Sequence, residues 1–176
     1  MRAAAGVMLV CLAAGCRPHP PAAEDGATPP APAANQAPHP AADSIVLERT
    51  RCFGLCPAYR LSIARSGAVH FESRNPGDST RAVSTTPSPG AFEALVRQAE
   101  ALRFWSLPDQ IAGSALCKQR ATDHPGAATT IFGRGGSKRV DDYLGCFDAP
   151  QALRRFETAI DSAAGSARWV RPAAVR

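Results

Sequence analysis

Apolar and polar residues alternate with a period of two in two parts of the chain, which predicts two β-hairpins with one buried face each. The first hairpin is expected over residues 57–73, with its turn at Ser66-Gly67. The second is expected over residues 127–143, with its turn at residues 134–137. A shorter apolar run, Ile45-Val46-Leu47, predicts a further strand ahead of both. The hairpin positions expected to be buried are Tyr59, Leu61, Ile63, Val69, Phe71, Thr129, Ile131 and Val140.

A helical repeat of apolar residues follows each predicted hairpin. Ser88 and Pro89 are expected to cap and open a helix of about 14 residues with one apolar face. Asp148 is expected to cap a second helix that has Pro150 in its first turn. Residues 106–125, which precede the second hairpin, show no periodicity and are expected to form an irregular loop. The apolar stripes of the helices are Phe92, Leu95, Val96, Ala99 and Leu102, and then Leu153, Phe156 and Ile160.

The order strand, turn, strand, helix thus occurs twice along the chain. Pro57 and Gly67 are ten positions apart, and so are Pro125 and Gly135. Strands that are joined by tight turns pair antiparallel, and each amphipathic helix must bury its apolar stripe against them. We therefore predict an α+β fold in which two ββα-like units form one antiparallel sheet, covered on one face by two helices.

The start of the chain has the organisation of an export signal: Arg2, followed by an apolar run from Ala3 to Ala14. This run is too short to span a bilayer, which needs roughly 20 apolar residues. Its end, Leu12-Ala13-Ala14-Gly15-Cys16, resembles the bacterial lipobox, in which the cysteine is acylated and becomes the mature N-terminus. We predict a signal peptide over residues 1–15 and lipidation of Cys16 with palmitate-type chains. An ordinary signal peptide or a buried helix is the alternative.

Residues 16–43 are predicted to be a Pro/Ala-rich tether behind the lipidated cysteine. Eight prolines, many alanines and no aromatic or large aliphatic residue follow Arg17, so the segment buries too little apolar surface to fold by itself. Such a composition favours extended polyproline II, although a proline-rich peptide ligand is the alternative. A single α+β domain is expected over residues 44–170, with a tail at residues 171–176. Arg17 rather than Asp after the cysteine resembles lipoproteins exported to the outer membrane.

Charge and motif content narrow the classes of function. The chain has a net charge of +5 and an isoelectric point near 9.1, but it contains no run of four or more lysines and arginines. Nucleic-acid binding is therefore not expected, whereas the mild positive charge suits an anionic lipid or polymer. Nucleotide-binding loops, hydrolase elbows and zinc-protease motifs are absent from the sequence. Asp141 and Asp142 are expected to face opposite sides of their strand, and Asp123 to bond backbone amides of its own loop. We predict no catalytic residue and no cofactor, and we do not expect an enzyme.

Arg49 precedes the string Cys52-Phe53-Gly54-Leu55-Cys56-Pro57-Ala58-Tyr59. This string resembles the opening signature of the bacterial domain of unknown function 6438, and the resemblance covers about residues 45–163. The resemblance implies a strand, a glycine turn and a strand after the signature, and it implies no activity because the family has none established. Further matching positions are Thr122-Asp123-His124-Pro125, Lys138, Arg139, Val140, Tyr143, Gly145, Ala149-Pro150, Leu153, Glu157, Ile160 and Asp161.

Six cysteines occur, of which Cys11 lies in the leader and Cys16 is the lipidation candidate. The other four are an even number in an exported chain, which indicates disulfides and leaves three pairings open. Relative to the family pattern, Cys117 and Cys146 look like a matched addition at one end of the second hairpin, and we expect them to pair. Cys52 and Cys56 are close in sequence and are expected to pair with each other.

The pair Cys52 and Cys56 supports three interpretations. The first is a structural turn that leads into the strand at Tyr59. The second is thiol exchange, because a closely spaced pair is readily strained and reduced. The third is Cu(I) binding by soft thiolates, since Cys-x-x-x-Cys-Pro resembles the metal-binding string of the Sco copper chaperones. Those chaperones have a thioredoxin fold, whereas this sequence shows no βαβ pattern. His70 and His124 are candidate further ligands by residue type alone.

We therefore expect a lipid-anchored, non-enzymatic domain on the periplasmic side of the cell envelope, held at the outer membrane, that binds a protein or an envelope component. The alternative, from a different class, is a thiol-redox or copper-handling protein that uses Cys52 and Cys56.

Overall fold

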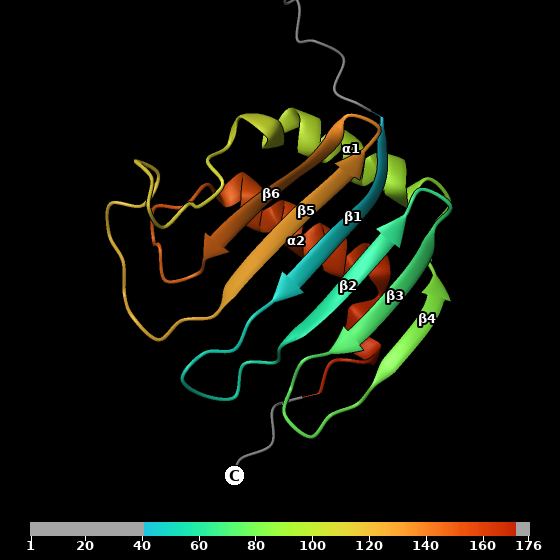
Figure 1. The fold of residues 1–176 in the computed structure, drawn as a ribbon, viewed down its shortest axis with the longest axis horizontal. Helices are drawn as coiled ribbons and strands as arrows, with labels where there is room; N and C mark the ends of the chain where they lie inside the picture. Colours follow the sequence, from blue (N-terminus) through green and yellow to red (C-terminus); the bar gives the residue numbers. More distant parts are fainter. Residues whose placement is uncertain (1–40, 172–176) are drawn as a thin grey trace, which may run out of the picture. The chain divides into compact units, whose positions relative to one another are not determined.

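The computed structural model describes residues 41–171, so the leader, Cys16, most of the tether and residues 172–176 lie outside the described residues. The described part forms a six-stranded antiparallel sheet and two helices, which confirms the predicted α+β class (Figure 1). The strands are β1 (Ala42–Arg49), β2 (Tyr59–Ala64), β3 (Ala68–Ser73), β4 (Arg81–Thr85), β5 (Gly126–Gly133) and β6 (Gly136–Tyr143), in the spatial order β4-β3-β2-β1-β5-β6. The helices are α1 (Ala91–Ala101) and α2 (Gln151–Ala164), accompanied by the 3-10 turns η1 (Phe104–Ser106) and η2 (Ser166–Arg168).

Strand β1 lies in the middle of the sheet and joins the two predicted hairpins. Its Leu47 lies opposite Leu61 of β2 on one side and opposite Thr129 of β5 on the other, and both pairings are antiparallel. Ile45 and Leu47 are fully buried. A buried central strand must pair its backbone groups along both edges, and this explains why the short strand predicted at residues 45–47 extends over eight residues.

Strand β4 is an edge strand that the sequence pattern did not predict. Its five residues pair with β3, and Glu72 forms an ion pair with Arg81 across the two strands. Val83 is 70% exposed. An edge strand with so little buried apolar surface shows only a weak alternation of apolar and polar residues. The periodicity of the sequence therefore hardly predicts this strand.

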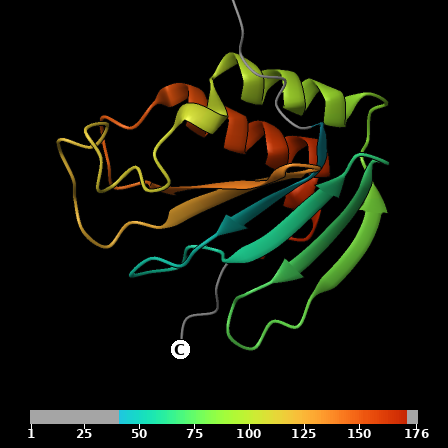
Figure 2. The same cartoon turned by 45° about the horizontal axis from the view of Figure 1, so that its top comes forward.

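Both helices pack on the same face of the sheet, as the turned view in Figure 2 shows. Helix α2 buries its predicted stripe of Leu153, Phe156 and Ile160, and Phe156 meets Phe104 of η1 edge to face, with the ring centroids 5.9 Å apart. The other face of the sheet carries charges of alternating sign on the neighbouring strands β1 to β4. Within residues 41–171, neither helix is long and apolar enough to cross a bilayer.

The two predicted side-chain caps are wrong. Helix α1 begins after Gly90, which has a left-handed φ of 73°, and Ser88 instead accepts a backbone hydrogen bond from Ala91. Helix α2 begins after Pro150, and the Asp148 carboxylate accepts the backbone N–H groups of Lys118 and Gln119, at 3.0 Å each. The residues around Cys117 lie next to Asp148 in the folded chain, so this long-range partner replaces the local helix cap.

Candidate functional site

Both disulfides lie at one end of the sheet, which we call the loop end. Here β1, β3 and β6 finish and β2, β4 and β5 begin. In Figure 1 the connecting segments gather below and to the left of the strands. These segments are residues 50–58, 74–80, 107–125 and 144–150.

The first disulfide joins Cys52 to Cys56, with the two Cα atoms 5.6 Å apart, and confirms that predicted pairing. It closes a short loop that presents Phe53, 90% exposed, and Leu55, 52% exposed. Large apolar side chains with this much exposure contribute little to the core. The bridge therefore fixes a loop whose apolar side chains point away from the domain.

The second disulfide joins Cys117 to Cys146 across 5.4 Å between Cα atoms, which confirms the other predicted pairing. Backbone hydrogen bonds from Ala121 N–H to the Gly145 carbonyl and from Phe147 N–H to the Gln119 carbonyl hold the same two segments together. A Cβ at Gly145 would lie 2.5 Å from the Ala121 carbonyl oxygen, so this close approach requires glycine.

The two disulfide-closed segments contact each other through the residues before β5. The Phe53 N–H donates to the Asp123 carbonyl at 3.3 Å, and the His124 ring meets the exposed Phe147 ring edge to face at 6.2 Å between centroids. The His124 N–H also donates to the Tyr143 hydroxyl at 3.1 Å. Phe53, Leu55 and Phe147, which we call the apolar loop tips, therefore project from one interlinked group of loops.

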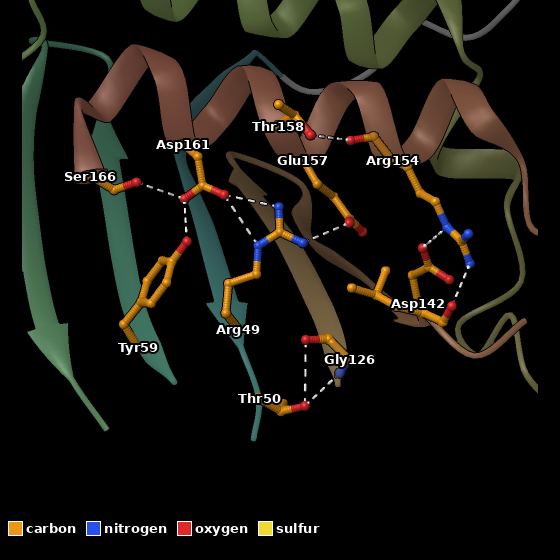
Figure 3. A network of polar contacts seen from close by, with 11 residues as sticks. Arg49, Thr50, Tyr59, Gly126, Asp142, Arg154, Glu157, Thr158, Asp161 and Ser166 are labelled. Carbon is orange, nitrogen blue, oxygen red and sulfur yellow. Dashed lines mark hydrogen bonds and ion pairs between the residues drawn. The ribbon is translucent and has the colours of Figure 1, made fainter. Parts of the chain in front are cut away.

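A network of charged residues lies behind the loop end, between the sheet and α2 (Figure 3). Arg49, the last residue of β1, donates to Asp161 at 2.9 and 3.2 Å and to Glu157 at 3.2 Å. The Tyr59 hydroxyl donates to Asp161 at 2.7 Å, and Ser166 donates to the same oxygen at 3.0 Å. Glu157 and Asp161 are one helical turn apart, which places both carboxylates over Arg49.

A second ion pair extends the network toward β6. Asp142 is buried and accepts a hydrogen bond from Arg154 at 3.1 Å, while the same guanidinium donates to the carbonyls of Leu144 and Cys146. One oxygen each of Asp142 and Glu157 has no partner within residues 41–171. Asp141 lies on the opposite face and pairs with Arg139, which confirms that the two aspartates diverge.

Burial and charge together set the protonation of this network. Burial, opposed by Arg49 and reinforced by the Asp142 charge, raises the pKa of Glu157 from its ordinary 4.5 to about 8. Burial and the Asp161 carboxylate raise the pKa of Tyr59, so its hydroxyl stays a donor. Burial alone would lower the pKa of Arg49, but Asp161 and Glu157 outweigh it and raise the pKa. Within residues 41–171, the charged groups of this network hold one another in position and leave no unpaired base that faces solvent.

Raising the pH from 6 to 9 should destabilise the domain through Glu157. Its pKa is higher in the folded chain than in the unfolded chain, so the folded state holds the extra proton between pH 4.5 and about 8. Stability therefore falls as pH rises through this window, by at most about 1.4 kcal/mol per pH unit. Urea unfolding at several pH values measures how steeply the free energy of unfolding falls with pH, and Glu157→Gln should remove this slope. The matched control, Glu100→Gln on the exposed side of α1, should retain the slope. Equal slopes in both variants would refute the assignment of the pH dependence to Glu157.

A hollow of about 340 Å³ opens where β1 ends and β2 begins. Two hydrogen bonds fix its position: the Ala58 N–H donates to the Asn75 side chain at 2.8 Å, and the Arg74 N–H donates to the Ala58 carbonyl at 2.7 Å. The lining residues are Glu48, Arg49, Thr50, Arg51, Ala58, Tyr59, Arg60 and Arg74. The hollow therefore carries an excess of positive charge beside the Cys52–Cys56 loop.

The candidate copper ligands do not form a metal-binding group. His70 lies in the middle of β3, and His124 lies in the segment before β5 beside Phe147. Among residues 41–171, no three or more His, Cys, Asp or Glu side chains are arranged to hold a metal ion.

The Asp123 carboxylate accepts from the Thr122 hydroxyl at 3.0 Å, so the expected bonding of Asp123 to loop amides is wrong.

Sequence reasoning missed the charged network and the hollow. The sequence indicates Arg49, Glu157 and Asp161 only through the family resemblance, and Tyr59 also as a buried strand position, and it predicts no contact between them. The one local signal was the spacing of Glu157 and Asp161 beside the apolar stripe of α2. Their partner, Arg49, is 108 residues away from Glu157 in sequence, so no local pattern links them.

A protein-family model matches most of the chain. The model described as "Domain of unknown function (DUF6438)" matches residues 43–164, which is most of the described domain. No curated protein matches the chain.

Proposed function

The chain belongs to the DUF6438 family, whose description gives no function, and we propose that it is a lipid-anchored, non-enzymatic binding module of the cell envelope. It presents the loop end to a protein or another envelope component. In this proposal the acylated Cys16 holds the chain at the outer membrane, on the periplasmic side, and the Pro/Ala-rich tether separates the domain from the lipid.

The observation that supports this proposal is the pair of disulfides beneath the apolar loop tips. Three of the five exposed large apolar side chains of residues 41–171 are Phe53, Leu55 and Phe147, all at the loop end. Aromatic anchors on a fixed backbone bind with a smaller loss of conformational entropy than flexible ones. The two disulfides also suit an oxidising compartment outside the cytoplasm.

The thiol-redox and copper alternatives receive less support. Cys52 and Cys56 are joined to each other, and no histidine completes a group of metal ligands with them in the described part of the chain. The binding proposal uses the same loop differently, because it requires the disulfide to stay closed while Phe53 and Leu55 make contact.

Lipidation makes a separate prediction at Cys16. Cys16→Ser should abolish acylation, so the protein should stay uncleaved with its leader or be released from the membrane fraction. Membrane fractionation with mass spectrometry of the N-terminus measures both outcomes. Cys11→Ser, a matched change inside the predicted leader, should leave processing unchanged. Normal cleavage and membrane retention of the Cys16→Ser protein would contradict the anchor.

Photo-crosslinking in living cells tests the binding surface. The full chain carries p-benzoylphenylalanine in place of Phe53, or in place of Phe147, or in place of Phe132. Phe132 is a matched control because it is an exposed aromatic residue beside the β5–β6 turn, at the other end of the sheet. We expect adducts of the same mass from positions 53 and 147 and none from position 132.

Two results would reject the binding surface. The first is the absence of any adduct at positions 53 and 147, under conditions in which the chain is folded and membrane-bound. The second is the same set of adducts at all three positions, which would indicate random collisions.

A further inference from the structure

We propose that the arginine-lined hollow at the ends of β1 and β2 binds side-chain carboxylates of an acidic peptide segment on the partner. This inference rests on the proposed function and adds the chemical class of the ligand. The first reason is charge: four arginines and one glutamate line the hollow. One of the four, Arg49, turns inward to Glu157 and Asp161, so Arg51, Arg60 and Arg74 provide the charge at the opening.

These three guanidinium groups retain donors for a ligand. Arg60 uses its Nε to reach Glu48 at 3.2 Å, and Glu48 is shared with Arg139. Arg74 pairs through one nitrogen with Glu72, which is shared with Arg81. Each glutamate thus serves two arginines, and positive charge remains in excess. A guanidinium has five N–H donors in a planar fork that fits a carboxylate.

Of these three arginines, Arg51 has the fewest interactions with other side chains of the described residues. It is exposed and lines the hollow, and no ion pair joins it to another side chain in the described part of the chain. It also directly precedes Cys52, the first residue of the disulfide-closed loop. A ligand that contacts Arg51 is therefore next to the loop that carries Phe53 and Leu55.

The neighbouring apolar loop tips favour a peptide over other anions. The Cys52–Cys56 loop leaves the hollow after Arg51 and returns to it at Ala58, so the segment that carries the exposed Phe53 and Leu55 directly adjoins the cationic lining in the chain. Inorganic phosphate would use only the guanidinium groups. A peptide that combines acidic and large apolar side chains would use both.

Fluorescence anisotropy with the full chain in detergent tests the proposal. The probe is a labelled peptide of alternating leucine and glutamate, compared with the same peptide carrying glutamine in place of glutamate. We expect the glutamate peptide to bind, with affinity that falls as salt rises, and the glutamine peptide to bind at least about tenfold more weakly. Arg51→Glu should weaken binding of the glutamate peptide by at least about tenfold, because it reverses a charge at the hollow.

A matched control removes the effect of net charge. Arg134 is exposed in the β5–β6 turn at the other end of the sheet, and Arg134→Glu changes the net charge by the same amount. Its affinity for the glutamate peptide should stay within about twofold of wild type. Arg74→Gln provides a second variant in the hollow and should weaken binding in the same direction as Arg51→Glu. Unchanged urea midpoints would establish that both hollow variants are folded.

Several results would overturn the assignment. Equal losses in Arg51→Glu and Arg134→Glu would indicate attraction by net charge alone. Absence of binding to the glutamate peptide at millimolar concentration would exclude the acidic peptide class. Binding of inorganic phosphate or phosphatidylglycerol vesicles that depends on Arg51, without binding of the peptide, would assign the hollow to another anion.

Crosslinking separates failure of this inference from failure of the proposed function. If the adducts at positions 53 and 147 keep their full yield in the Arg51→Glu chain, the acidic site is wrong while the binding surface stands. If the wild-type chain gives no adducts at these positions, the proposed function is wrong whatever the peptide experiment gives.

Discussion

Arg49→Met should destabilise the domain by about 3–5 kcal/mol at pH 8, because it leaves the buried Glu157 and the part-buried Asp161 without their cation. Glu157 has a side chain that is only 1% exposed, and within residues 41–171 Arg49 is the one guanidinium bonded to it. Asp161 loses two hydrogen bonds in the same substitution. Methionine keeps much of the side-chain volume, so the effect reports charge more than packing.

The destabilisation by Arg49→Met should depend on pH. Glu157 can relieve its buried charge by taking up a proton, because its pKa is already raised to about 8. The loss should therefore be smaller at pH 6 than at pH 8, and Arg49→Met combined with Glu157→Gln should be less destabilised at pH 8 than the sum of the two single variants. Urea unfolding measures all four chains as a double-mutant cycle.

The control for this experiment is the neighbouring Arg51→Met. Arg51 is exposed and makes no ion pair in the described residues, so its removal should change stability by less than about 0.5 kcal/mol. A loss in Arg49→Met as small as that of the control, or one that is the same at pH 6 and pH 8, would contradict the role given to the network.

Replacing Cys117 and Cys146 together with serine should destabilise the domain by about 3–4 kcal/mol, on the chain-entropy model for a loop of this length. The two cysteines are 29 positions apart, so their bridge removes much conformational freedom from the unfolded chain. Cys146 is also fully buried, and a serine hydroxyl there adds a polar group to the core.

The matched variant replaces Cys52 and Cys56, which are only four positions apart. The same model gives about 2 kcal/mol for this bridge. Non-reducing urea unfolding of the two double variants gives the comparison directly. A larger loss for Cys52 and Cys56 than for Cys117 and Cys146 would show that loop length does not govern the contribution of these bridges.

The hairpins and helices were predictable because their signals are local. Tyr59, Leu61 and Ile63 alternate with polar residues on a strand whose one face is buried, and Leu153, Phe156 and Ile160 recur once per helical turn. Both disulfide pairings were also predicted correctly. Strand β4 was not predicted, because its five residues lie at an edge and bury almost nothing.

The charged network could not be predicted because it is a tertiary feature. Glu157 is a polar residue inside the otherwise apolar stripe of α2. It can be buried because Arg49 of β1 forms an ion pair with it. The predicted cap of α2 is wrong for the same reason, since Asp148 takes its partners from the segment around Cys117. The hollow likewise depends on Arg74 lying beside Arg51 and Arg60, which only the folded chain brings about.

The central claim is that the apolar loop tips form one surface for one partner, and the yield of the crosslink at position 147 tests it most directly. The yield is compared in cells between the chain with Phe53 and Leu55 intact and the chain with both replaced by serine. Both side chains are exposed, so the change should leave the urea midpoint unaltered. The account predicts that the adduct at position 147 is lost when Phe53 and Leu55 are removed from the folded, membrane-bound chain. An undiminished adduct would contradict it, because Phe147 would then bind its partner independently of the Cys52–Cys56 loop.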